Sequence, residues 1–128
     1  MLGQGAQELF KATAIPSGKE WAVFFAELMG AAIFGFAFAT ARKQVERLTK
    51  GFTVGLGLFL GLLIAGSAAA AVSGMAILNP AVAVALQAIS FASVWPVAIY
   101  VFATAVGAVA GFLLSDLLSS ETYGNTDV

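Results

Sequence analysis

The sequence predicts an all-α integral membrane protein with three transmembrane helices and one re-entrant half-helix. Of its 128 residues, 60% are hydrophobic and 10% are charged, whereas about 25% of the residues in a soluble domain are charged. No charged residue occurs between Lys50 and Asp116, a run about three times as long as the ~20 apolar residues that cross a bilayer. Within this run, the pair Asn79-Pro80 interrupts the apolar pattern and favours the start of a new helix.

The composition excludes several classes of function. The chain has no Cys and no His, so it lacks thiol chemistry, disulfides, the usual zinc ligands and the commonest general base. An enzyme is therefore not expected, and neither is a metal or a cofactor. The net charge is −1 and the six Lys and Arg residues are scattered, which disfavours nucleic acid as a partner because no basic face is formed.

Three segments are predicted: a surface segment over residues 1–20, a membrane domain over residues 21–118 and a polar tail over residues 119–128. The first segment is interpreted either as a short amphipathic stretch on the membrane surface or as a loosely ordered tail. It has no short apolar stretch that ends in a small-residue cleavage site. The first apolar span is therefore expected to remain in the mature protein, a multi-pass protein of a cell or inner membrane.

The membrane domain is predicted to contain apolar spans over residues 21–41, 51–72 and 97–118. Trp21 and the pair Arg42-Lys43 flank the first span, as interfacial aromatic and basic residues commonly do. Small residues let helices approach closely. We expect such packing from glycines of the second span, Gly51, Gly55, Gly57 and Gly61, and of the third span, Gly107 and Gly111.

The half-helix is predicted to begin at the Asn-Pro pair and to run to about residue 90. Asn is a favoured N-cap and Pro is favoured at the first helical position. Ten helical residues rise ~15 Å, half of the hydrocarbon thickness. Non-helical backbone at membrane depth must be buried in protein or line a wet cavity. Residues 73–79 therefore indicate such a cavity.

Three motifs carry a resemblance to a known family. AELMG occurs at 26–30, SG at 73–74 is followed by LNPAV at 78–82, and YVFATAVGA occurs at 100–108. They resemble the AExxG, SG…LNPAV and YxxAQxxGA signatures of the aquaporin and glycerol-facilitator family, the major intrinsic proteins. Members of that family contain two such repeats, inverted relative to each other. The resemblance covers residues 21–118 and implies half of the aquaporin fold.

The resemblance assigns roles to residues of the loop and the half-helix. It places the amide of Asn79 and the helix end at Pro80 and Ala81 in the centre of a pore, where the positive end of the helix repels cations. It makes the backbone of four residues the pore wall, namely Met75, Ala76, Ile77 and Leu78. The loop has one residue more than the family loop SGAHLNP, so either Leu58 or Phe59 takes the position of the family's filter aromatic.

Glu27 is the one ionisable residue of the first span, and such residues usually face protein or a cavity. By resemblance, Glu27 supports the loop together with Ser73 and Gly74, by accepting hydrogen bonds from the loop backbone. Proton coupling is the alternative. Thr104 stands where the family usually has Gln.

Val82 departs from the second family loop, which reads NPAR and supplies a filter Arg.

The resemblance implies a passive channel for water or small neutral solutes, such as glycerol or gases, formed by an antiparallel homodimer in the lipid bilayer. The family's four pores would then require eight chains. The alternative is a non-conducting assembly subunit or a partner of a different half-channel. The loop over residues 42–50 holds four positive residues, and Lys11, Lys19 and the amino terminus lie on the other side of the membrane. This is a modest bias against insertion in both orientations.

Overall fold

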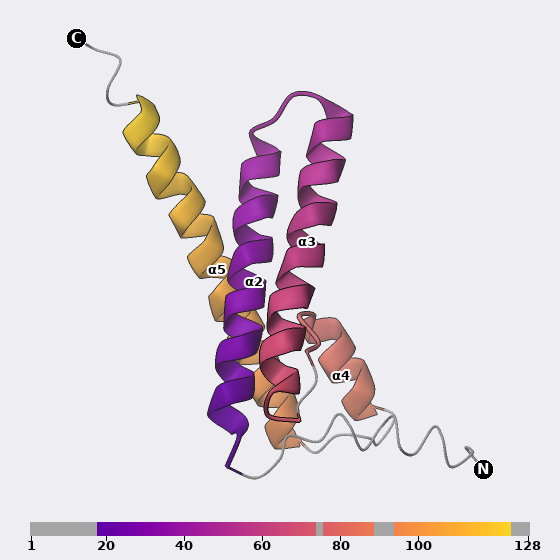
Figure 1. Cartoon of the computed structure of the whole chain (residues 1–128). Coiled ribbons are helices and arrows are strands. Elements are labelled where there is room, and N and C mark those ends of the chain that lie inside the picture. Colours follow the sequence, from indigo (N-terminus) through magenta and orange to yellow (C-terminus); the bar gives the residue numbers. More distant parts are fainter. Residues whose placement is uncertain (1–17, 74–75, 89–93, 124–128) are drawn as a thin grey trace.

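The computed structural model describes residues 18–73, 76–88 and 94–123, and these residues form four α-helices and no strand (Figure 1). The helices are α2 (Glu20–Arg42), α3 (Arg47–Ala70), α4 (Pro80–Ala88) and α5 (Val94–Tyr123). Three of them, α2, α3 and α5, are long and apolar enough to cross a membrane. The predicted class is confirmed: an all-α membrane protein with three spans and one short helix. Residues 1–17 of the predicted surface segment lie outside the described ranges.

Two helix ends differ from the prediction by more than three residues. Helix α3 begins at Arg47, one turn before the predicted residue 51, because the carboxylate of Glu46 accepts hydrogen bonds from the backbone N–H groups of Leu48 and Thr49 and from the Thr49 hydroxyl. These bonds lower the pKa of Glu46, with the Thr49 hydroxyl as the largest cause. At the other end of the chain, α5 continues to Tyr123, so the predicted polar tail begins inside a helix.

Helix α2 is the centre of the bundle. It packs against α3 on one side and against α5 on another, whereas α4 packs against α5 (Figure 1). The α2–α3 loop and the C-terminal end of α5 lie at one end of the bundle, and the first residues of α2 and α5 lie at the other (Figure 1). Helix α4 is on the half of the bundle where α2 begins (Figure 1).

Glycine sets the distance between α2 and α3. A Cβ atom added to Gly30 would lie 2.7 Å from the backbone oxygen of Gly61, and one added to Gly61 would lie 2.6 Å from the oxygen of Gly30. One turn away, a Cβ atom added to Gly57 would collide with the methyl group of Ala37. The helices cross here with backbone against backbone, which requires residues without a side chain.

The contact between α2 and α5 follows the same plan. A Cβ atom on Gly35 would meet the backbone oxygen of Ala108 at 2.5 Å, and Cβ atoms on Gly107 and Gly111 would collide with the backbone of α2. The expectation of close packing is wrong within the chain for two glycines of the second span. Gly51 and Gly55 have no atom within 4 Å of an added Cβ, because they lie away from the Gly57 and Gly61 face of α3.

Polar contacts join the far ends of α2 and α5. The ammonium group of Lys43 lies 3.0 Å from a carboxylate oxygen of Asp116 and 2.7 Å from the hydroxyl of Ser119. The guanidinium of Arg42 lies 5.7 Å from the centre of the Phe112 ring, a cation–π distance. These contacts keep the charged end of the bundle together where α2 leaves the membrane.

A glycine substitution at the α2–α5 crossing tests this packing. Gly111→Ala is expected to lower the free energy of unfolding by about 1–3 kcal/mol, because its methyl group would force the two backbones apart. Gly55→Ala is the matched control, and it should be neutral or slightly stabilising, since Ala is favoured over Gly in helices. Denaturant titration of both variants in micelles measures the difference; equal effects would contradict the assigned crossing.

Candidate functional site

The chain is non-helical at residues 76–79 and becomes helical again at Pro80, the predicted start of the half-helix. The side-chain oxygen of Asn79 accepts hydrogen bonds from the backbone N–H groups of Ala81 at 2.9 Å and Val82 at 3.4 Å. Asn79 is thus the N-cap of α4. Its carboxamide oxygen is occupied by this cap, and its side chain is exposed in the single chain.

The point where the loop ends and α4 begins lies near the middle of the membrane. The side chain of Leu78 contacts the crossing of α2 and α3, where an added Cβ atom on Gly30 would lie 2.8 Å from it. Gly30 is ten residues after the first residue of α2 and twelve before the last. At 1.5 Å per residue this is ~15 Å and ~18 Å from the two ends. Asn79, the next residue after Leu78, is therefore at about mid-depth.

Glu27 fixes the loop to α2. Its side chain is fully buried, and its two carboxylate oxygens accept hydrogen bonds from the backbone N–H groups of Ile77 at 2.5 Å and Leu78 at 2.8 Å. Both oxygens therefore have a donor, so the carboxylate is held in one position. This geometry favours the predicted supporting role of Glu27 over a proton-coupling role.

Leu78 has a left-handed backbone conformation, with φ of 48°. This region is rare for residues other than glycine and costs about 1–3 kcal/mol. Two contacts stabilise it: the hydrogen bond to Glu27 and the burial of the side chain among Ala31 and Ala65. Sequence reasoning placed Leu78 in the pore wall through its carbonyl and missed this anchoring role, because nothing in the sequence indicates a positive φ at a leucine.

One face of α4 is packed and the other is open. Ala83 belongs to a buried cluster with Val23 of α2 and with Val97 and Tyr100 of α5. The exposed residues of the helix include Ala81, Val82, Val84 and Ala85. Together with exposed Asn79 and Pro80, they give the chain an open apolar surface around the start of the half-helix.

The remaining predicted site residues lie as follows. Ala76 is half-buried, whereas Gly74 and Met75 lie outside the described residues. Ser73 is exposed with a left-handed φ of 59°. Leu58 and Phe59 are 39% and 61% exposed, and neither belongs to the cluster around Leu78. The choice between Leu58 and Phe59 therefore stays open. Thr104 is buried, and its hydroxyl donates to the Tyr100 backbone oxygen in its own helix.

Three spans, with a short helix that begins at mid-depth after a loop held by a buried carboxylate, have the architecture of a membrane channel. The chain belongs to the major intrinsic protein family, that of the aquaporins, because the family model matches residues 14–127. The predicted resemblance is confirmed. The protein is thus an integral multi-pass membrane protein of a family whose members are channels for water or small solutes. Comparison with curated proteins and with solved structures finds no match.

Removing the Glu27 carboxylate should destabilise the loop. Glu27→Ala leaves the N–H groups of half-buried Ile77 and buried Leu78 without an acceptor, at about 1–3 kcal/mol each, and we expect it to weaken both folding and assembly. Glu27→Gln keeps one acceptor and should lose less. Met29→Ala, at an exposed residue of the same helix, is the control. Unfolding and oligomer size are measured; unchanged assembly with an altered pH dependence of flux would contradict the supporting role.

Proposed function

We propose that two copies of this chain, inserted in opposite orientations, form one pore for water or small neutral solutes. The observation that carries this proposal is the open surface around Asn79. It contains non-helical backbone at mid-depth, and lipid cannot supply hydrogen bonds to the carbonyl oxygens of such backbone. A second protein surface must therefore face it, with a wet cavity between the two.

The length of α4 supports an inverted second copy. Its nine residues rise ~14 Å, about half of the ~30 Å hydrocarbon thickness. A second half-helix that enters from the opposite side would complete the crossing and bring the two N-terminal ends together at mid-depth. The positive ends of both helices would then repel cations, while the two Asn79 amides donate hydrogen bonds to a passing neutral molecule.

Val82 determines the character of the proposed constriction. It lies three residues after Asn79 and is 44% exposed, on the open side of α4. Two copies would place two valines there, and the chain has no His and no Arg in its half-helix. A neutral, apolar wall favours uncharged solutes, among them glycerol-sized molecules and dissolved gases, alongside water.

Vesicle flux tests the channel. Proteoliposomes that contain this chain alone should change volume faster than empty vesicles after an osmotic shock. Val82→Trp should reduce the rate several-fold, because the larger ring occupies the space on the open side of α4. Val109→Trp is the control, since Val109 is exposed on the long helix α5. If water and every small neutral solute cross no faster than in empty vesicles, the chain is a non-conducting subunit.

The charge pattern is the observation that favours a second candidate, pairing with a different half-channel. Arg42, Lys43, Arg47 and Lys50 lie at the end of the bundle with the α2–α3 loop, whereas Lys19 lies at the other end. Strict application of the positive-inside rule would place every chain the same way up. A reporter fused to the C-terminus distinguishes the two, because signal from both membrane faces requires dual insertion.

Cysteine cross-linking tests the antiparallel pair directly, since the chain has no native Cys. In the proposed dimer, two Asn79→Cys residues meet at mid-depth, and a short bifunctional thiol reagent should join them. Val45→Cys is the control: Val45 is 96% exposed in the α2–α3 loop, and inverted copies place it on opposite membrane faces. Cross-links at 45 and none at 79 would indicate parallel copies and exclude the proposed pore.

A further inference from the structure

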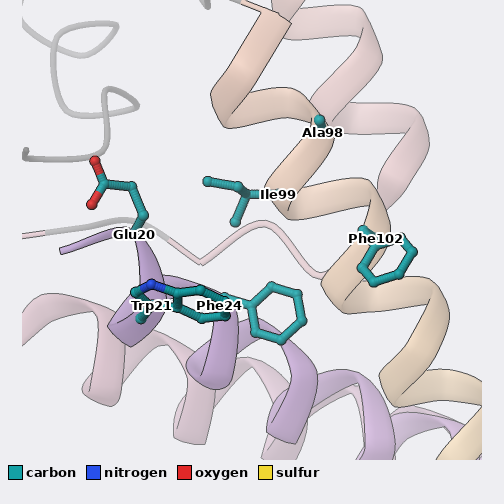
Figure 2. Close-up of a pocket in the computed structure, with 6 residues that line it drawn as sticks. All are labelled: Glu20, Trp21, Phe24, Ala98, Ile99 and Phe102. Carbon is teal, nitrogen blue, oxygen red and sulfur yellow. The ribbon is translucent and has the colours of Figure 1, made fainter. Parts of the chain in front are cut away.

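A groove of about 640 Å³ lies between the first turns of α2 and α5. Figure 2 shows its lining, with side chains from α2 facing side chains from α5. The lining residues are Glu20, Trp21, Phe24, Ala98, Ile99 and Phe102. Its volume is in the range of small-molecule binding sites.

The groove is separate from the surface around Asn79. On α5, Val97 and Tyr100 pack against Ala83 of the half-helix, whereas Ala98 and Phe102 are exposed and line the groove. Successive residues of a helix are ~100° apart, so these two pairs point to different sides of α5. A second copy that covers Asn79 therefore does not fill the groove through the same contact.

Aromatic rings form a continuous wall along the groove (Figure 2). The ring centres of Trp21 and Phe24 are 6.0 Å apart in an edge-on arrangement, and those of Phe24 and Phe102 are 6.4 Å apart and stacked. Trp21 is 72% exposed and Phe102 is 64% exposed. In a membrane such a concave apolar wall contacts more atoms of a hydrocarbon chain than a flat helix surface does.

Glu20 is the one charged residue of the lining, and it is also the first residue of α2. A helix that crosses the membrane begins where the lipid headgroups lie, and the neighbouring Trp21 is a residue type typical of that level. A carboxylate there pairs with a primary ammonium group by charge-assisted hydrogen bonds.

We propose that the groove binds a phospholipid with an amine headgroup: one acyl chain lies along Trp21, Phe24 and Phe102, and the ammonium group pairs with Glu20. The apolar wall selects a lipid chain over a polar solute, and the single carboxylate selects an amine headgroup over an anionic one without an amine.

Tryptophan fluorescence tests this site. The chain has two tryptophans, so in Trp95→Phe the fluorescence comes from Trp21. Vesicles contain a constant low fraction of brominated lipid, either phosphatidylethanolamine or phosphatidylglycerol, because bromine on an acyl chain quenches a tryptophan in contact with it. We expect several-fold stronger quenching by the ethanolamine lipid. Adding Glu20→Gln should abolish this preference, whereas Lys19→Gln, at an exposed charge next to the groove, should leave it unchanged.

If Trp95→Phe does not fold, a second pair of measurements still tests the site. Native mass spectrometry of the unaltered chain should retain the ethanolamine lipid, and Ala98→Phe, which fills the groove, should lose it. Equal quenching by both lipids, with no effect of Glu20→Gln, would overturn the proposal. Weak quenching that increases when the protein is diluted in lipid would also overturn it, because the increase would mean that a second copy occupies the groove before dilution. None of these results depends on flux through the pore.

Discussion

The structure depends on one constraint: backbone N–H groups at the middle of a membrane need acceptors within the protein, since each unpaired group costs several kcal/mol there. Around the start of α4, most of these groups have an acceptor. Glu27 accepts from the N–H groups of residues 77 and 78, proline 80 has no N–H, and Asn79 accepts from those of residues 81, 82 and 83 through its side chain and its carbonyl. A buried acid and a capping amide therefore allow a helix to begin at mid-depth in this chain.

The loop also depends on the glycines at the crossing of α2 and α3. Leu78 reaches the α2–α3 crossing because Gly30 and Gly61 leave room for it, and its buried side chain holds a backbone conformation that leucine rarely adopts. Helix α2 serves as the scaffold for this arrangement. It carries Glu27 and Gly30, the polar and the steric attachment of the loop, within one turn of each other.

Local signals were enough to predict the helices and the position of the break. Long apolar runs define the spans, and Asn followed by Pro defines the start of α4, since both depend on neighbouring residues only. What the sequence could not supply arises from contacts between distant segments. These include the left-handed Leu78 and the side of α3 on which Gly51 and Gly55 lie. The choice between Leu58 and Phe59 is undecided for a related reason, because in the single chain neither belongs to the cluster that anchors the loop.

The residues that the structure describes contain three spans, an odd number, so the described part of the chain begins and ends at opposite ends of the bundle. Its first span begins at one end of the bundle and its last span finishes at the other (Figure 1). A tandem duplication that joined two copies end to end would start the second copy on the far side of the bilayer, and the two halves would be inverted without any change in their charges. A double-length chain of this kind would hold both orientations in one molecule.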